Sequence, residues 1–180
     1  MSRRFAWMLM VVMMAGFLPR LWAQADQNDP LTPDEVQQIR DNRTNPNERI
    51  KLYIKFLDQR VDALKQLSAQ PPGGDTWSAQ VRDKLEEFTQ LCDELQDNLD
   101  MYDSAHADIR KSLKDLKEDT AKWPPVLNGL PENRNYEFSQ KTALEAAQSA
   151  ADQTKQLAEE QDIFFTAHRS LKGKTGNGPS

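Results

Sequence analysis

Apolar residues recur along most of the chain at alternating spacings of three and four, which is typical of helices that bury one face. The most regular stretch runs from Asp75 to Trp123 and contains neither Gly nor Pro. Eleven of its 13 heptad positions are apolar or aromatic, against 5 of the 30 positions between them. This pattern predicts one continuous helix of about 70 Å, packed against partner helices. The heptad positions are Val81, Leu85, Phe88, Cys92, Leu95, Leu99, Tyr102, His106, Ile109, Leu113, Leu116, Thr120 and Trp123.

Helix start and stop signals divide the rest of the chain. Thr32 with Glu35 three residues later predicts a capping box, and Asn45 before a proline is a second start signal. Runs of Pro and Gly after residues 70 and 123 predict turns. We therefore expect helices over residues 33–42, 46–70, 75–123 and 133–171. The fold class is all-α.

Short connections place consecutive helices antiparallel. A turn at residues 71–74 predicts that facing residues have numbers that sum to about 146, which places Cys92 beside Ile54. A turn near residue 129 gives a sum of about 259 for the last pair and places Cys92 near His168. These registers predict an elongated antiparallel three-helix bundle, a coiled-coil hairpin with one very long central helix, over residues 32–172.

In such a bundle the stretch from about residue 114 to residue 145 has only two helices with which to bury its apolar residues. Some of these residues would then stay partly exposed and form an interaction tip. The expected tip residues are Leu116, Trp123, Val126 and Leu130.

The first 25 residues resemble a secretory leader. Two arginines precede a 14-residue apolar run from Phe5 to Leu18, and Ala23-Gln24-Ala25 has the small-x-small form that signal peptidases cleave. The apolar run is shorter than the roughly 20 residues that span a bilayer. We expect residues 1–25 to be a signal peptide, with a retained anchor as the alternative, and the mature chain to begin at Asp26. Residues 26–31 are expected to be a flexible lead-in and residues 173–180 a disordered tail.

Removal of the leader leaves 20 basic against 28 acidic residues, a net charge of −8. An acidic surface repels phosphate backbones, so nucleic-acid binding lacks its usual electrostatic attraction. The same charge disfavours adhesion to anionic membranes, and the mature chain has no segment that predicts stable membrane insertion. With one cysteine there is no internal disulfide.

Cys92, His106 and His168 are the residues whose chemistry could matter most. Cys92 and His106 share a helix face but are about 21 Å apart on one helix, too far for one metal ion. Asp103 and His106 resemble half of a di-iron motif, but no second half is present. The 259 register instead brings Cys92 close to His168, a pairing that could activate a thiol. We favour the interpretation that Cys92 is a small residue buried in the core. We therefore expect no catalytic residue, no metal and no cofactor.

These patterns favour a non-enzymatic protein, exported to a periplasm or secreted, that acts through contacts with other proteins, a second copy of the chain included. A holdase-type periplasmic chaperone is the alternative. A thiol- or metal-dependent enzyme built on Cys92 and His168 is the third hypothesis.

Overall fold

The computed structural model describes residues 29–173, and the predicted signal peptide lies outside that range, as does all but the first residue of the predicted tail. The described residues form helices and contain no strand, which confirms the all-α class. The helices are α1 (Pro33–Asp41), α2 (Pro46–Ser68), α3 (Asp75–Ser104), α4 (Arg110–Thr120), α5 (Trp123–Asn128) and α6 (Glu137–Ala167), followed by a short 3-10 turn, η1 (Arg169–Leu171).

The two predicted helix starts are confirmed. The Thr32 hydroxyl accepts a hydrogen bond from the Glu35 amide at 3.3 Å, and the Glu35 carboxylate accepts one from the Thr32 amide at 2.7 Å. The Asn45 side chain caps α2 in the same way, accepting from the Glu48 amide at 3.3 Å. Each cap satisfies backbone N–H groups that the first helical turn leaves without partners.

The prediction of one unbroken helix from Asp75 to Trp123 is wrong. α3 ends at Ser104, and the chain reverses at His106, whose φ of 51° is left-handed. The Ala107 amide donates to the Tyr102 carbonyl and the His106 amide to the Asp103 carbonyl. This pair of bonds is a Schellman motif, which ends helices and usually has glycine where this chain has His106.

Two buried or half-buried side-chain amides hold the reversal in place. Gln161 on α6 donates to the Ala107 carbonyl at 3.0 Å and accepts from the Ile109 amide at 3.1 Å. Asn47 on α2 donates to the Asp108 carbonyl at 2.8 Å and accepts from the Ser112 hydroxyl at the same distance. The backbone groups that the break leaves unpaired are thus bonded from the two neighbouring helices.

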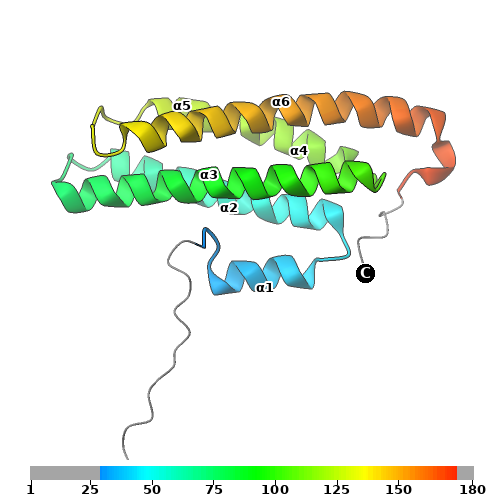
Figure 1. Ribbon diagram of the computed structural model, residues 1–180, viewed down its shortest axis with the longest axis horizontal. Coiled ribbons are helices and arrows are strands. Elements are labelled where there is room, and N and C mark those ends of the chain that lie inside the picture. The colour runs from blue at the N-terminus through cyan, green and yellow to red at the C-terminus, as the bar shows by residue number, and fades with distance from the viewer. Residues whose placement is uncertain (1–28, 174–180) are drawn as a thin grey trace, which may run out of the picture.

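The reversal makes the molecule a four-helix bundle rather than a three-helix one. α3 and α6 lie in front, with α2 and the α4–α5 segment behind them (Figure 1). α2 and α6 each pack against both α3 and α4, whereas α3 and α4 lie diagonally opposite, with no pair of Cα atoms within 8 Å. The stretch that was expected to form one central helix therefore forms two helices, which lie at opposite corners of the bundle.

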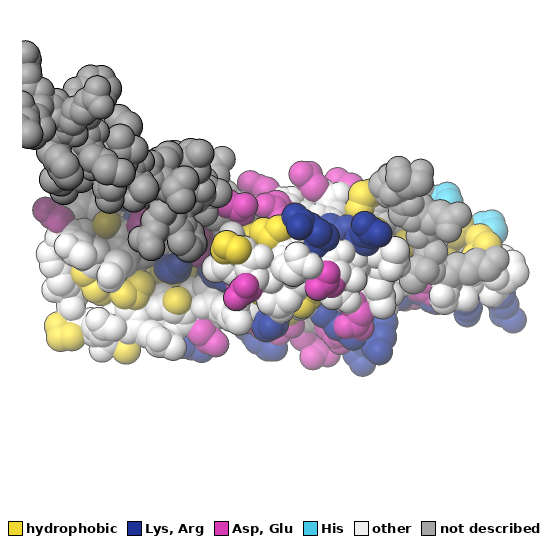
Figure 2. All heavy atoms as spheres, turned by 90° about the horizontal axis from the view of Figure 1, so that it is seen from below, with side chains coloured by type: hydrophobic (Ala, Val, Ile, Leu, Met, Phe, Trp, Pro, Cys, Tyr) yellow, Lys and Arg dark blue, Asp and Glu magenta, His cyan; other side chains and the backbone are white. Residues whose placement is uncertain are grey.

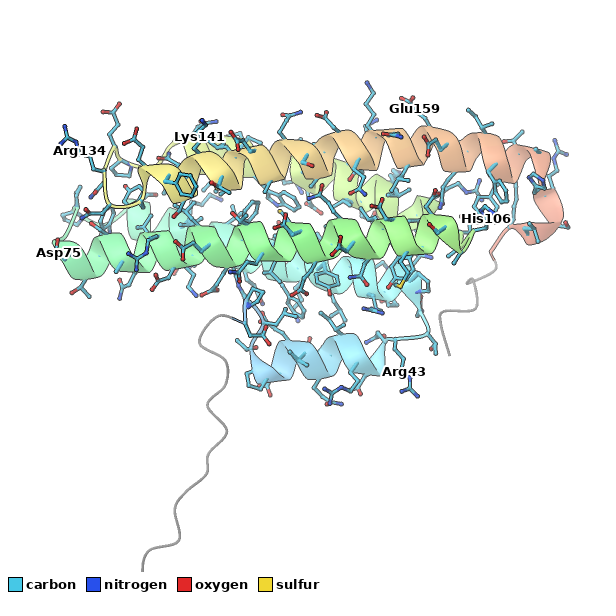
Figure 3. The ribbon with its side chains drawn as sticks, in the orientation of Figure 1. Arg43, Asp75, His106, Arg134, Lys141 and Glu159 are labelled. Atoms are coloured by element: carbon cyan, nitrogen blue, oxygen red, sulfur yellow. The ribbon has the colours of Figure 1, made fainter. Side chains whose placement is uncertain are left out.

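α3 and α6 run parallel, which corrects the antiparallel register expected for them. Hydrogen bonds join Glu86 to Ser139 and Gln96 to Ser149, both pairs 53 residues apart. Figure 3 shows the same direction, with Asp75 and Arg134 at one end of the molecule and His106 towards the other. The register of α2 against α3 is confirmed, since Arg60–Glu87 is a contact whose numbers sum to 147, close to the expected 146.

Four buried alanines line the inward face of α6. The core itself is continuous from one end of the bundle to the other. Twelve of the 13 heptad positions between Val81 and Trp123 are buried, and His106 is the exception. The heptad pattern therefore identified the buried residues correctly although the helix does not continue. The buried alanines are Ala143, Ala146, Ala147 and Ala150.

Replacement of Gln161 by Leu should destabilise the bundle by about 3 kcal/mol, because it leaves the buried Ala107 carbonyl and Ile109 amide without partners. Urea unfolding of the monomeric chain, followed by far-UV circular dichroism, measures the loss. Gln156→Leu, an exposed position on the same helix, is the control and should change stability by less than about 0.5 kcal/mol. Equal stability of the two variants would show that Gln161 does not hold the reversal.

Candidate functional site

The predicted interaction tip does not lie on the surface of the bundle. Leu116, Trp123 and Leu130 are buried, and Val126 is half-buried. The Trp123 indole donates to the Asp58 carboxylate at 2.8 Å and packs edge-on against Phe88. The expectation that these side chains stay partly available is therefore wrong, because α4 and α5 fold back between α2 and α6 instead of extending beyond them.

Cys92 and His168 do not meet. Cys92 is buried on α3, where burial, followed by the nearby Asp93 carboxylate, raises the pKa of its thiol and keeps it in the unreactive form. The parallel register places Cys92 opposite the first third of α6, near Glu145, whereas the exposed His168 follows the last residue of that helix. The antiparallel direction assumed for α6 was the source of the predicted pairing.

Both histidines of the chain lie instead on the two faces of one ring. Phe164 stacks on His106 at 4.5 Å and on His168 at 4.4 Å between ring centroids. The two side chains are exposed at one end of the molecule (Figure 2). A cavity of about 180 Å³ lies beside His106, and its other lining residues are Asp103, Glu160, Gln161, Phe164 and Phe165. Across residues 29–173, no cluster of three or more His, Cys, Asp or Glu side chains could hold a metal ion.

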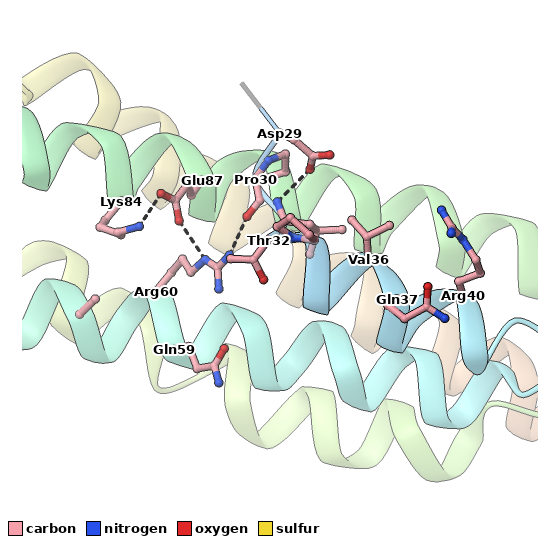
Figure 4. A pocket seen from close by; sticks show the side chains of 13 residues that line it. Asp29, Pro30, Thr32, Val36, Gln37, Arg40, Gln59, Arg60, Lys84 and Glu87 are labelled. Carbon is pink, nitrogen blue, oxygen red and sulfur yellow. Dashed lines mark hydrogen bonds and ion pairs between the residues drawn. The ribbon is translucent and has the colours of Figure 1, made fainter. Parts of the chain in front are cut away.

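A groove of about 860 Å³ lies beside α1. α1 folds back antiparallel along α2, rather than continuing it, and covers only part of the face that α2 and α3 share (Figure 1). The groove occupies the uncovered part (Figure 4). Its apolar lining residues are Pro30, Leu31, Pro33, Val36 and Ala63, and its polar ones are Asp29, Thr32, Gln37, Arg40, Gln59, Arg60, Lys84 and Glu87.

A buried ionic network holds one wall of this groove. The Arg60 guanidinium donates to both Glu35 carboxylate oxygens at 2.5 and 2.8 Å and to Glu87 at 3.0 Å. It also donates to the Pro30 carbonyl at 2.6 Å, so the described end of the expected flexible lead-in is bonded to α2. One side chain of α2 thus fixes α1, the segment before it and α3 relative to one another.

The same network sets the charge state of Glu35. Burial favours the neutral acid and acts to raise its pKa, but the hydrogen bonds from Arg60 and the Thr32 amide, with the Arg60 charge, outweigh burial and leave the pKa below its usual value. The hydrogen bond to Glu35 is in turn the main cause that raises the pKa of Arg60. Both groups are therefore ionised at neutral pH, and neither is free to transfer a proton.

One feature of the sequence points to this site independently of the heptad pattern and of the capping box, which identifies Glu35 as a capping residue only. Arg60 falls between Leu57 and Val61 on the inward stripe of α2, where a charge needs a buried partner. Its partner lies 25 residues earlier, on a helix whose direction the sequence did not fix.

Chemically, the groove combines apolar contact surface with side-chain amides and charges of both signs. Such a lining suits a segment of polypeptide, which presents apolar side chains together with backbone N–H and C=O groups. The groove residues include no His or Cys, and Arg60, the most buried charged residue of the lining, is bonded to Glu35 and Glu87.

Comparison of the chain with protein families, with curated proteins and with solved structures finds no match. Within the described range, the helices are all too short or too polar to cross a bilayer.

Acidification should release α1 from the bundle. The charged form of Glu35 is favoured in the folded chain, so its stabilising contribution is present above pH 4.5 and is lost as the pH falls through its lowered pKa. Amide chemical shifts of α1 between pH 7 and pH 2.5 follow the release. Glu35→Gln should weaken docking by roughly 2 kcal/mol at pH 7 and remove this part of the pH dependence.

Asp34→Asn, an exposed change in the same helical turn, is the matched control and should leave the transition in place. An unchanged transition in Glu35→Gln would mean that another group controls the docking of α1.

Proposed function

We propose that this chain is an exported, non-enzymatic helical protein that binds a segment of another protein in the groove beside α1. The observation that carries the proposal is the groove itself. Its volume of about 860 Å³ lies in the range of binding clefts, and it is bounded by α1, α2 and α3. It is held open by interactions within the chain, because the Arg60 network fixes α1 at a defined distance from α3.

The charges around the groove support a polypeptide ligand over a nucleic acid or a membrane. Arg40 and Lys84 stand with Asp29 and Glu87, so neither sign dominates the lining. A groove for phosphate groups would present mainly cations. Mixed charge with apolar walls favours partner segments of mixed composition.

The alternative hypotheses receive less support. A holdase needs an extended apolar surface for unfolded clients, whereas the large hydrophobic residues exposed within residues 29–173 are Phe138 and Ile163, at opposite ends of α6. An enzyme built on Cys92 and His168 would need the two side chains together. A binding protein requires neither condition.

Export rests on the leader pattern of residues 1–25. N-terminal sequencing of the protein recovered from the cell envelope or the medium tests it, and the expected first residue is Asp26. A chain that accumulates in the cytoplasm and begins at Met1 or Ser2 would contradict export and leave the groove proposal to be judged separately.

Filling the groove should abolish partner binding. Ala63 lies in the groove lining, so Ala63→Trp places an indole where the ligand segment would lie. Gln66→Trp adds the same group at an exposed position on α2 outside the lining and is the matched control. Pull-down from envelope extract, quantified by mass spectrometry, should recover partners at least about tenfold less with Ala63→Trp, which corresponds to 1.4 kcal/mol or more.

Circular dichroism first establishes that both variants fold. Recovery of the same partners by both variants at wild-type level would exclude the groove as the binding site.

A further inference from the structure

The stretch from Asp75 to Thr120 folds as two helices but has the sequence of one. Its heptad spacing continues through the reversal without a slip, and no Gly or Pro interrupts it. Heptad residues on both sides of the break are buried against the same pair of helices, α2 and α6. A single straight helix would present these residues along one continuous face.

The reversal holds a strained residue that a straight helix would relieve. His106, at φ 51°, is the non-glycine residue with a positive φ among residues 29–173. A side chain in the left-handed region costs energy that a helical conformation does not. Short hinge loops under strain favour the exchange of elements between copies of a chain.

We propose that two copies of this chain exchange their α4–α6 segments, and that residues 75–120 become one continuous helix in the resulting dimer. In each half of the dimer, α2 and α3 of one copy pack with α4, α5 and α6 of the other. The partner is a second copy of this chain, because the surface exposed on opening is one half of the bundle core and only the other half is complementary to it.

Almost every contact of the monomer re-forms in the exchanged dimer. α2 to α4–α5 contacts, such as Trp123 with Asp58, become contacts between copies, as do α3 to α6 contacts, such as Gln96 with Ser149. No Cα atom of α3 lies within 8 Å of a Cα atom of α4 in the monomer, so the two helices are not packed side by side and straightening the hinge separates no neighbouring pair of helices.

The free-energy difference between the monomer and the exchanged dimer depends mainly on the five hinge residues, 105–109. The monomer keeps the Schellman bonds, the two bonds from Gln161 and the bond from Asn47 to the Asp108 carbonyl, whereas the dimer gains regular helical bonds through the hinge and loses the left-handed residue. Association costs entropy, so the ratio of dimer to monomer rises with chain concentration. This inference is independent of the proposed groove function.

Two variants at one position test the hinge. His106→Gly and His106→Ala both lose the imidazole and its stacking on Phe164, but only glycine adopts a left-handed φ without strain. The equilibrium constant for straightening one hinge should be roughly fivefold larger with alanine than with glycine. Because the dimer contains two hinges, its dissociation constant should be roughly 25-fold lower for His106→Ala than for His106→Gly.

The chains are refolded from urea at high and low concentration, because exchange requires the bundle to open, and are measured by size-exclusion chromatography with light scattering. His106→Gly should remain monomeric where His106→Ala is dimeric. Equal dissociation constants, or monomers alone for every variant at all concentrations, would overturn the proposal.

A cross-linking experiment distinguishes exchange from a side-by-side dimer. In a Cys92→Ala background, one preparation carries Gln96→Cys and the other Ser149→Cys, two positions that are in contact between α3 and α6. After the two preparations are refolded together, a short bismaleimide should join the Gln96→Cys chain to the Ser149→Cys chain. A dimer by light scattering that gives no such cross-link would exclude the exchange of α4–α6.

Discussion

The arrangement of the bundle depends on the hydrogen bonds that hold its chain reversal at His106. Gln161 and Asn47 reach the reversal from α6 and α2 and bond the backbone groups that a helix end leaves unsatisfied. A buried amide pair without such partners would cost several kcal/mol, which is a large part of the stability of a domain of this size. Because those bonds form, the chain leaves α3 and crosses the bundle diagonally to α4.

The direction of α6 follows from that crossing, and so do the positions of Cys92, His106 and His168. Each turn reverses the chain, so the additional turn makes α6 run parallel to α3. Cys92 then lies opposite the first third of α6, and both histidines lie at the C-terminal end of that helix around Phe164. The same turn places α4 and α5 over the core, which encloses Trp123.

Much of the fold was predictable from the sequence because local signals and the apolar period report on burial. The caps at Thr32 and Asn45, the α2–α3 register and the buried heptad residues were all predicted correctly. The break at Ser104 was not, because two helices that face one core have the same heptad as one long helix. The groove depends on where α1 ends and which way it runs, and the only sequence signal for it was the charge of Arg60 on an inward stripe.

The hydrogen bond from Arg60 to the Pro30 carbonyl determines at which end of the chain a tag or tether can be fused. Pro30 is tied to α2, and Asp29 lines the groove, so any polypeptide joined ahead of these residues departs from the rim of the cleft. Gly173, by contrast, donates to Asp108 at the far end of the bundle. Affinity tags, fluorophores or surface tethers are therefore best fused after the C-terminal residues, since an N-terminal fusion would begin at the rim of the proposed binding groove.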